Sequence, residues 1–397
     1  MKSKILKFVG NSRNIIIIYV LFALLASIQG ASSGPKTFGD NGAEYTEYNN
    51  YVIFKKSFEH LKDNQDLYAL YPEEHWDLYK YTPTFAAFFG VFSISPDVVG
   101  LSLWNLLNAL LLLLAVYYLP KLSTTQKGFI LLFVLLELLT NMQNEQSNGL
   151  IAGLLIMSFG LLERKKLMWA SLCIVFSVFI KIFGVVGFAL FLFYPQKWKL
   201  AMYTVGWTLL LLLIPLIWID LGQYTALFES YKQMLSEDHS ISYGYSVMGW
   251  IYTWFSIEVN KNIIVLIGAI LFMVPLVKFK LYQQHAFKYL TMVSILIWVV
   301  IFNHKAESPT YIIAMAGAAL WFIQGKKNTL NTVLFVSAFV FTSLSPTDLF
   351  PRFIRESYVN PYLLKAVPCI LIWFKIIYDM ILFDKSEPDE NVEALVD

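Results

Sequence analysis

The feature that most constrains this chain is a series of long apolar runs separated by short polar segments. Residues 14–28, 101–119 and 262–277 contain no charged side chain, and each is long enough, or nearly so, to cross the hydrocarbon core of a bilayer. Over the whole chain 57% of residues are apolar and 15% are charged. Such hydropathy predicts an all-α, polytopic membrane protein.

The distribution of positive charge predicts the topology. The amino terminus is basic, and five short basic connectors follow it at residues 121–127, 163–166, 196–199, 278–280 and 325–327. Lysine and arginine in short loops favour the cytoplasm, so all six segments are placed there and the chain crosses twice between neighbouring connectors. The expected result is about 12 transmembrane helices with both termini in the cytoplasm.

Three segments need separate interpretation. The run at residues 14–28 follows Lys2, Lys4, Lys7 and Arg13, which is typical of a signal peptide, but the many later spans favour a retained first helix. Residues 82–94 are too short for a span and are interpreted as re-entrant or interfacial. A single membrane domain is expected over residues 1–383, with outer loops 31–81, 221–261 and 345–361, followed by an acidic cytoplasmic tail at 384–397.

Lys181 is the only charged residue between Lys166 and Lys197. A charge at the bilayer centre costs roughly 2.5 to 17 kcal/mol, so it must meet water, an interface or an anion. Two short helices, 167–180 and 183–193, would place Lys181 at a turn on the outer side. One long span is the alternative, and a lysine that merely snorkels at a helix end is the plainer interpretation of this side chain.

All the polar stretches fall on the predicted outer face. They are residues 31–81, 141–148, Lys181, 221–261, 303–309 and 345–361. A transporter usually keeps polar groups near the membrane midplane on repeated, broken helices, and no internal repeat is evident. A one-sided array of polar loops therefore favours an enzyme active site at the outer leaflet.

The first outer loop, residues 31–81, combines acidic and aromatic residues. Its carboxylates are candidates for a general base, and its aromatic rings suit sugar faces or lipid headgroups. Tyr51, Phe54, Phe58 and Leu61 share one face of a helix, so an amphipathic interfacial helix with solvated charges is the alternative interpretation.

Several function classes are disfavoured. The net charge of +2 is spread over short loops, which gives no nucleic-acid surface, and Cys173 and Cys369 provide neither a disulfide framework nor a metal cluster. A phosphate-binding glycine loop, a zinc-binding His-Glu-x-x-His and a serine hydrolase elbow are absent from the sequence. The first loop has no Asp-x-Asp pair, which disfavours a metal-held diphosphate donor. No metal or cofactor is expected.

The order of four motifs resembles glycosyltransferase family 87, the polyprenol-phosphate-dependent hexosyltransferases of the GT-C class. Residues 50–61 with Asp66-Leu-Tyr68 are similar to the first-loop helix of the family, and Tyr81-Thr-Pro-Thr-Phe85 to its Tyr-Pro-Pro segment. Glu145-Gln-Ser-Asn148 is similar to its Gly-Gln-x-Asn turn and Ile180-Lys-Ile-Phe183 to its Leu-Lys-Pro-Tyr turn. Weaker similarities occur at residues 245–249 and 307–311.

The resemblance implies a hexose donor on polyprenyl monophosphate and direct displacement with inversion. Lys181 would neutralise the leaving phosphate, while Gln146, Asn148 and Asn50 would bind donor phosphate or sugar. Candidate groups for the acceptor or for lipid headgroups are Tyr81, His304, Lys305, Arg352 and Arg355. Gln146 and Asn148 are also interpretable as helix-capping residues, and the loop around His304, Lys305 and Glu307 as a plain polar loop.

Four positions depart from the family pattern. Asn50 occupies the position of the presumed catalytic aspartate, and an amide cannot take a proton from a hydroxyl. Glu47, one helical turn earlier, is therefore the expected base, with Asp40 and Glu44 as reserves. Glu145 replaces a glycine and places a second acid near the site. Thr82 replaces one proline of the Tyr-Pro-Pro segment. Ile182 replaces the proline after the lysine, so the turn at Lys181 is less rigidly imposed.

The sequence therefore predicts a membrane glycosyltransferase that moves a hexose, mannose first, to a lipid or glycan acceptor. Its partners would be the polyprenyl-phosphate sugar, the acceptor and membrane lipids, without nucleic acid. The expected location is the bacterial inner membrane with the site facing the periplasm. A lipid-linked sugar flippase or transporter and a glycan ligase or polymerase remain as alternatives. Glu137 is another charged residue within an apolar run. It lies near the outer end of its helix, which fits an enzyme site on the outer face better than a path across the membrane.

Overall fold

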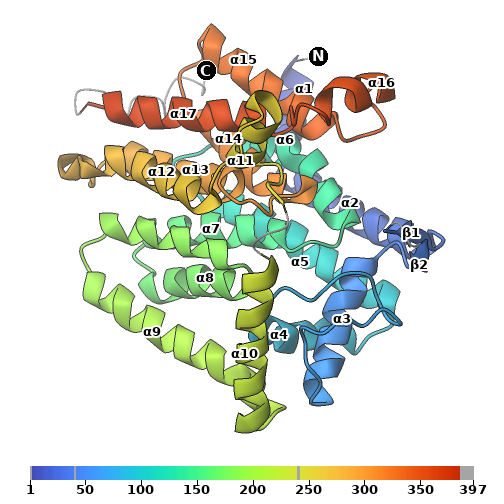
Figure 1. The fold of residues 1–397 in the computed structure, drawn as a ribbon. Coiled ribbons are helices and arrows are strands. Elements are labelled where there is room, and N and C mark those ends of the chain that lie inside the picture. Colours follow the sequence, from blue (N-terminus) through green and yellow to red (C-terminus); the bar gives the residue numbers. More distant parts are fainter. Residues whose placement is uncertain (1, 40–41, 239–241, 385–397) are drawn as a thin grey trace.

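The computed structural model describes residues 2–39, 42–238 and 242–384. These residues form a mostly helical molecule with one small hairpin of strands (Figure 1). The acidic tail lies outside the described residues except for Asp384, and so does Asp40. The prediction of an all-α, polytopic membrane protein is confirmed, whereas the domain boundaries remain predictions.

The elements alternate between apolar helices and polar connections. The first part of the chain contains α1 (Lys2–Val9), α2 (Ser12–Ser32), β1 (Lys36–Phe38), β2 (Ala43–Tyr45), α3 (Asn49–Lys62), α4 (Pro83–Ser93), α5 (Asp97–Tyr118), α6 (Thr124–Gln143), α7 (Asn148–Glu163) and α8 (Leu167–Ile180). The second part contains the 3₁₀ helix η1 (Ile182–Phe193), α9 (Lys197–Leu213), α10 (Leu221–Asp238), α11 (Val247–Phe255), α12 (Lys261–Met273), α13 (His285–Ile301), α14 (Tyr311–Gln324), α15 (Thr329–Ser337), α16 (Arg352–Ile354) and α17 (Val367–Leu382).

Among the described residues, four helical segments have both the length and the apolar composition to cross a membrane, namely Ser12–Ser32, Asp97–Tyr118, Thr124–Gln143 and Lys197–Ile217. Shorter apolar helices include α7, α8, η1, α13 and the segments Lys261–Val277 and Thr329–Leu344. A 16-residue helix such as α7 reaches only about 24 Å, less than the hydrocarbon thickness. The figure of about 12 crossings therefore stays a prediction.

The six basic segments gather at one end of the helices, here called the basic end. Glu163, at the end of α7, accepts a hydrogen bond from Tyr194 Oη at 2.8 Å and pairs with Lys288 of α13 at 2.5 Å. Further contacts join the connectors: Lys121 O accepts from Gln324 Nε2, Lys127 Nζ donates to Tyr117 O, Lys278 Nζ to Ile381 O, and Gly128 packs on Val9. This clustering is what a common membrane side for the connectors requires.

The hairpin predicted around Lys181 is confirmed, and the alternative of one long span is wrong. α8 ends at Ile180, η1 begins at Ile182, and the extended backbone of Lys181 (φ −140°) turns the chain between them. The two helices pack side by side. A Cβ on Gly184 would lie 2.4 Å from Ser177 Oγ, so this glycine permits the close return.

α4 fits the predicted re-entrant or interfacial segment. It has 11 residues, or about 16 Å of helix. Its start is joined to the Lys181 turn, because Thr82 Oγ1 donates to Phe179 O at 2.6 Å. After its end, Asp97 pairs with Lys55 of α3 at 2.7 Å. Both ends of α4 therefore lie at the end of the helices opposite the basic end, here called the polar end.

The predicted first-loop helix exists as α3, and its apolar face is covered by protein. Tyr51, Phe54, Phe58 and Leu61 are all buried. Phe54 meets Tyr81, Phe85 and Phe89 edge to face, with ring centroids 4.9 to 5.4 Å apart. Aromatic pairs of this geometry add to the stability gained by burial, so α3 and α4 form one packed unit rather than a free interfacial helix.

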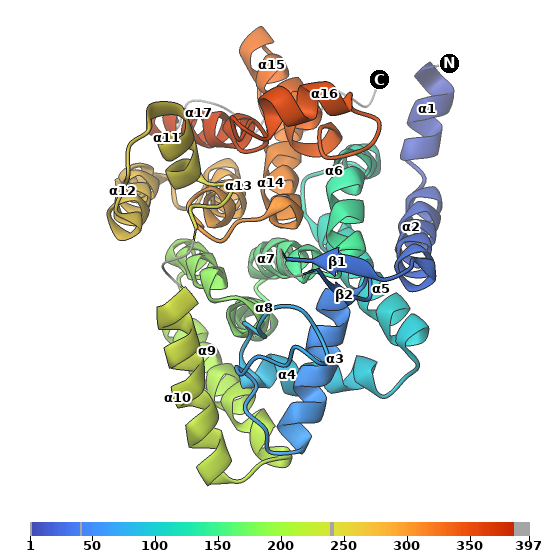
Figure 2. The same ribbon diagram turned by 45° about the vertical axis from the view of Figure 1, so that its right-hand side comes forward.

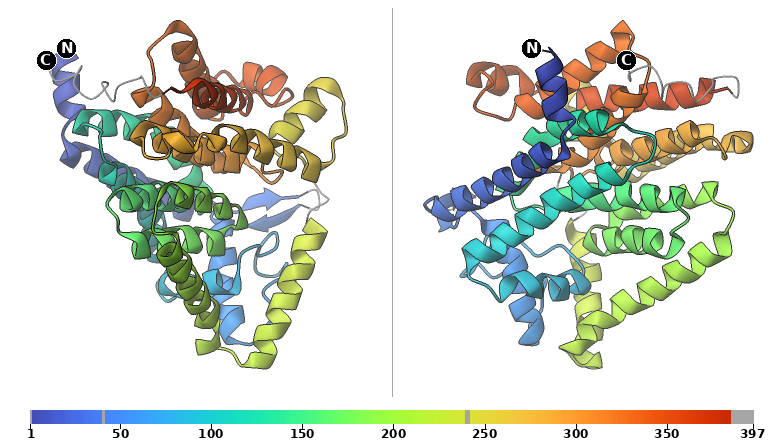
Figure 3. Two further views of the ribbon diagram at one scale, coloured as in Figure 1. Left: turned by 90° about the vertical axis from the view of Figure 1, so that its left-hand side faces the viewer. Right: turned by 180° about the vertical axis from the view of Figure 1, so that it is seen from behind.

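α3 and α10 run across the direction of α7, α8 and α13 (Figures 1 and 2). Ser230 Oγ of α10 donates to Asp66 Oδ2 of the first loop at 2.7 Å, and the Tyr68 and Tyr231 rings are 5.2 Å apart. α9 and α10 meet at an apex (Figure 3), where Trp218 packs against Phe58 of α3 with ring centroids 5.6 Å apart. Most of α9 is exposed, as expected for an apolar helix that faces lipid.

Candidate active site

The centre of the polar end is the short turn between α6 and α7, residues 144–148. Asn141 holds it from inside: its Nδ2 donates to Gln146 O at 3.0 Å, and its Oδ1 accepts from the backbone N–H of Asn148 at 3.1 Å. Trp104 Nε1 donates to Glu145 O at 2.7 Å. Buried backbone groups are thereby paired with side chains, and the five residues of the turn are held in one conformation.

On one side of this turn lies the lysine site, which consists of Lys181, Gln146, Asn148 and Tyr81. Lys181 Nζ donates to Asn148 Oδ1 at 2.9 Å and to Gln146 Oε1 at 3.2 Å. The ammonium also lies 5.6 Å from the centroid of the Tyr81 ring. The Tyr81 hydroxyl donates to Gln146 Oε1 at 3.3 Å. Residues from three motifs that are far apart in the sequence therefore contact one another.

Thr82 brings two of these motifs together. Its side chain caps α4 by accepting from the N–H of Phe85 at 3.3 Å. The same hydroxyl donates to Phe179 O, one of the carbonyls that a helix end leaves without a partner. A proline, the residue type of the similar family motif, cannot provide this bond. The departure at Thr82 thus supplies a direct link between the start of α4 and the end of α8.

Two positive groups meet in the lysine site. α7 begins at Asn148, and a helix amino terminus carries a partial positive charge and points N–H groups outward. The Lys181 ammonium adds a full charge beside it. Loss of water lowers the pKa of Lys181 to about 8, and the Glu307 carboxylate acts in the opposite direction.

Asn148 also offers a hydrogen-bond donor. Its buried Nδ2 has no partner among the described residues. The orientation of the amide is fixed because the ammonium of Lys181 can only donate, so the oxygen must face it. A buried donor without a partner costs free energy. A cation, an unpartnered N–H and a helix amino terminus together form a site that an anion would complete.

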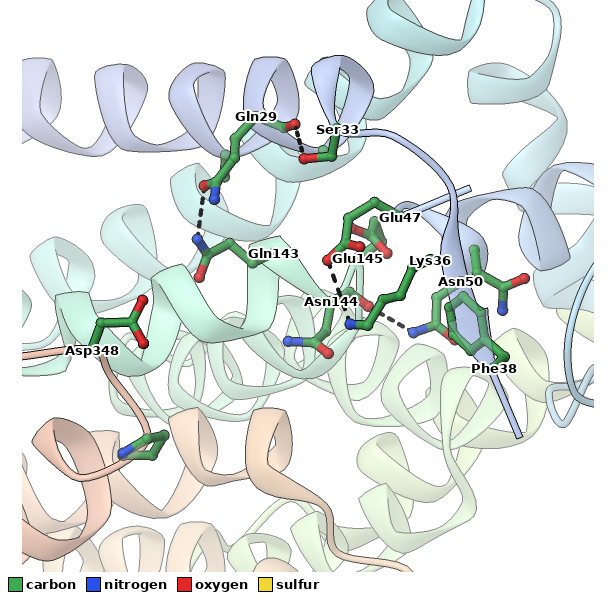
Figure 4. A pocket seen from close by; sticks show the side chains of 14 residues that line it. Gln29, Ser33, Lys36, Phe38, Glu47, Asn50, Gln143, Asn144, Glu145 and Asp348 are labelled. Atoms are coloured by element: carbon green, nitrogen blue, oxygen red, sulfur yellow. Dashed lines mark hydrogen bonds and ion pairs between the residues drawn. The ribbon is translucent and has the colours of Figure 1, made fainter. Parts of the chain in front are cut away.

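On the other side of the turn lies a polar cavity of about 470 Å³ (Figure 4). Three carboxyl groups, Glu47, Glu145 and Asp348, line it together with Lys36, and we call it the carboxyl cavity. The remaining polar side chains are Gln29, Ser33, Asn49, Asn50, Gln143 and Asn144. They come from the end of α2, the first loop, the end of α6 and the loop before α16. Lys181 does not line this cavity.

Glu47 and Glu145 face each other in the carboxyl cavity (Figure 4). Glu47 pairs with Lys36 Nζ at 3.5 Å and is partly exposed. Glu145 is only 2% exposed, and no hydrogen bond to its carboxyl group is formed by the described residues. Burial raises the pKa of Glu145 well above its usual range, the charge of Glu47 raises it further, and Lys36 opposes the effect. Glu145 therefore favours its neutral form beside Glu47.

The predicted site residues fall into separate groups. Lys181, Gln146, Asn148 and Tyr81 meet in the lysine site. Glu47 and Asn50 line the carboxyl cavity, where Asn50 Nδ2 donates to Asn144 O at 2.9 Å. Of the reserve bases, Glu44 lies on β2 and is exposed, and Asp40 lies outside the described residues.

Of the remaining predicted residues, His304, Lys305 and Arg352 belong to neither group, whereas Arg355 pairs with Asp348 of the carboxyl cavity at 3.9 Å. His304 and Lys305 are in the loop after α13, where His304 O is close to Gly244. Arg352 is exposed and pairs with Glu356 at 2.6 Å. Arg355 Nη1 donates to Thr347 O at 3.2 Å and so borders the cavity through the loop that carries Asp348.

Sequence reasoning missed several residues of the cavity, namely Gln29, Lys36, Gln143 and Asp348. Gln29 and Gln143 bond to each other at 2.8 Å from the last turns of α2 and α6. The only available signal was their position, since each is a polar residue at the outer end of an apolar run. In the described part of the chain, no group of three or more His, Cys, Asp or Glu side chains is arranged to hold a metal ion.

Comparisons with known proteins agree with the pattern of motifs. The sequence model of glycosyltransferase family 87 matches residues 79–303, more than half of the chain. The crystal structure of ArnT from Cupriavidus metallidurans bound to undecaprenyl phosphate is similar, with 14% sequence identity over 92% of this chain and 77% of ArnT, at a TM-score of 0.39. No curated protein sequence matches the chain. The matched range contains Tyr81, the 144–148 turn and Lys181.

Proposed function

Because the chain belongs to glycosyltransferase family 87, we propose that it moves a hexose from a polyprenyl monophosphate donor to a hydroxyl group of a lipid or glycan acceptor. Mannose is the first candidate for the sugar, as the family resemblance implies. The observation that carries the proposal is the lysine site, where Lys181 and the unpartnered amide of Asn148 meet at the amino terminus of α7. These groups suit a phosphate that gains charge as it leaves.

The reaction is a direct displacement. The acceptor oxygen attacks the anomeric carbon, the bond from that carbon to the phosphate oxygen breaks, and polyprenyl phosphate leaves with the bonding electrons. Lys181 stabilises the negative charge on the phosphate, and Asn148 Nδ2 donates a hydrogen bond to it. Gln146 and Tyr81 fix the ammonium in place. Attack opposite the leaving group inverts the configuration of the sugar.

Glu47 is the proposed base. It would take the proton from the acceptor hydroxyl, which makes that oxygen a better nucleophile. Its position on the wall of the carboxyl cavity and its salt bridge with Lys36, which fixes the side chain there, support this choice. Asn50 would contact the sugar from the same wall. His304, Lys305, Arg352 and Arg355 remain predicted contacts for acceptor or headgroups at the border of the site.

The active site is proposed to face outward, to the periplasm in a bacterial inner membrane. The support is that the basic connectors gather at the opposite end of the helices, and such connectors favour the cytoplasm. Reporters fused at Asn144 and at Lys165 test this topology. We expect the Asn144 fusion to behave as periplasmic and the Lys165 fusion as cytoplasmic, and the reverse pattern would contradict it.

The reaction is tested with purified protein in lipid nanodiscs, radiolabelled polyprenyl-phosphate mannose and total lipid and glycan extract as acceptor. We expect label to move to the extract with wild type. Donors with glucose or galactose on the same polyprenyl phosphate test which sugar is transferred. A donor with mannose on polyprenyl diphosphate tests which leaving group is used. Transfer only from the diphosphate would favour a ligase. Movement of intact donor across a sealed vesicle membrane, without label transfer, would favour a flippase and contradict the proposal.

A further inference from the structure

The carboxyl cavity is built for hydroxyl groups rather than for phosphate. Four of its side-chain amides, Gln29, Asn50, Gln143 and Asn144, keep hydrogen-bonding groups beyond their contacts within the protein, whereas Asn49 is bonded at both ends to the Trp76 backbone. Each amide has donors and an acceptor, as does each hydroxyl of a sugar. Its volume of about 470 Å³ lies in the range of small-molecule sites. The cavity also adjoins the proposed base, Glu47. A sugar residue is the chemical group that this combination accommodates best.

Glu145 is the most unusual residue of the cavity. Its side chain is buried, points into the cavity beside Glu47 (Figure 4), and forms no hydrogen bond with the described residues. Because the carboxyl group opens onto the cavity, its hydrogen-bonding partner has to come from there, and a hydrogen bond to it in so enclosed a site is favourable. An occupant with a hydroxyl group would provide the missing partner.

The backbone at Glu145 carries a conformational cost. Its φ is +48°, in the left-handed region that favours glycine and disfavours residues with a Cβ. The resemblance to family 87 places a glycine at this position of the turn. The left-handed residue ends α6, where the Gln146 N–H donates to Asn141 O at 3.0 Å, and a glutamate at this position has a backbone cost that a glycine avoids.

The charges of the cavity disfavour an anion. Lys36 pairs with Glu47, and Arg355 pairs with Asp348 at 3.9 Å, so both of these cations are already engaged by carboxylates. Glu145 places a further carboxyl group beside any anion that would enter. α2 and α6 both end at the cavity, and helix carboxyl termini carry partial negative charge; the start of α3 at Asn49 opposes them with one amino terminus. The site for phosphate lies instead across the turn, at Lys181.

We propose that the carboxyl cavity is the acceptor site, that it takes an uncharged sugar residue and excludes phosphorylated or uronic-acid acceptors, and that Glu145 binds the acceptor through a hydrogen bond. That the bound sugar is the acceptor of the reaction rests on the proposed function. That the cavity binds an uncharged sugar follows from its own residues. Sugar binding and sugar transfer are therefore tested separately.

Binding is measured by isothermal titration with wild type in nanodiscs, with octyl mannoside and octyl glucoside as neutral probes and octyl glucuronide as an anionic probe. We expect the neutral probes to bind at least about tenfold more tightly than the anionic one, since a like charge meets the carboxyl groups. Equal or tighter binding of octyl glucuronide would overturn the proposal, as would binding of none of the three probes.

Three variants locate the effect. Glu145→Gln keeps the shape and the donor of a neutral carboxyl group and should bind the neutral probes within about threefold of wild type. Glu145→Gly fits the backbone and should fold, yet bind them about tenfold more weakly, because one hydrogen bond is lost. Glu258→Gln, an exposed acid between α11 and α12, is the matched control and should not change binding. Unchanged affinity in Glu145→Gly would contradict the role of Glu145.

A final comparison separates this inference from the proposed function. Lys181→Met should lose binding of undecaprenyl phosphate and keep binding of octyl mannoside. If wild type binds the neutral probes in the Glu145-dependent way but transfers no sugar from any polyprenyl phosphate, the cavity assignment stands and the donor assignment fails. If Lys181→Met abolishes octyl mannoside binding as well, the two sites are not independent and the cavity proposal fails.

Discussion

The two sides of the turn at residues 144–148 differ in almost every physical respect. On one side, Lys181 lies at the amino terminus of α7 beside the unpartnered amide of Asn148. On the other, Glu47 and Glu145 share a cavity at the carboxyl terminus of α6. The difference shows how one short connection between antiparallel helices can serve two ligands of opposite character. The proposed leaving phosphate and the proposed neutral acceptor each meet the helix end that suits them.

The largest expected effect tests the acidic side. Glu47→Gln should lower the transfer rate by about 10³-fold, because the amide cannot take the acceptor proton. The measurement is the single-turnover transfer rate in nanodiscs with saturating donor. Glu44→Gln, an exposed carboxylate of the same loop, is the matched control and should stay near wild type. If the control loses activity and Glu47→Gln does not, the base has been assigned to the wrong residue.

The next effect tests the positive side. Lys181→Met should lower transfer by about 10²-fold, since charge on the leaving phosphate loses its counterion, and should weaken binding of undecaprenyl phosphate. Lys199→Met, an exposed lysine at the basic end, serves as control and should change neither quantity. Full activity of Lys181→Met would return this lysine to the role of a snorkelling anchor.

A third prediction concerns pH and sharpens the contrast. Glu145 has a pKa raised above its ordinary value, so it is neutral at low pH and ionises as pH rises through that raised pKa. The charged groups that act on it are Glu47 and Lys36, while Asp348, which lines the same cavity, is exposed and pairs with Arg355. Affinity for octyl mannoside should therefore fall by about tenfold on the alkaline side, as the donor proton is lost and two carboxylates meet.

The same ionisation has a consequence for stability. A folded-state pKa above the unfolded value means that the contribution of Glu145 to stability is complete at low pH and is lost as pH rises through the folded pKa. Titration of Glu145→Gln provides the control, because an amide does not ionise. If the variant and wild type show the same alkaline loss of affinity, another group is responsible.

The smallest expected effect tests how the two regions are held together. Thr82→Val removes the hydroxyl that caps α4 and donates to Phe179 O. We expect a loss of about 1 to 2 kcal/mol in stability, measured by thermal unfolding in detergent, with a moderate rise in KM for the donor as the Lys181 turn loosens. Thr332→Val, an exposed threonine on α15, should destabilise less.

Much of the framework was predictable from local patterns. The α8–η1 hairpin with Lys181 at its turn, the short α4 and the helix at residues 51–61 follow from apolar length and periodicity, which are local properties of the chain. Gln146 and Asn148 were assigned to the same donor site as Lys181, through motifs of the family that the chain resembles. Tyr81 was assigned to the acceptor or headgroups, yet it contacts Lys181 and Gln146. The roles of all these residues remain proposals.

Most residues of the carboxyl cavity could not be predicted from the sequence. Lys36, Gln29, Gln143 and Asp348 meet across four separate segments, and no local pattern indicates such contacts. Asn50 was assigned to the donor, yet it bonds to Asn144 and lines the cavity away from Lys181. Glu145 was visible as an extra acid, but its burial and its positive φ depend on how Trp104 and Asn141 hold the turn.

By itself the sequence determined that this protein lies in a membrane, which segments are helical and that Lys181 requires an anion, an interface or water. These follow from the cost of placing polar groups in hydrocarbon, a cost that each segment meets on its own. The tertiary structure alone decided that the acids and amides of the first loop meet the ends of α2 and α6. That meeting depends on packing between distant elements, where the energy comes from contacts that exist only once the helices are assembled.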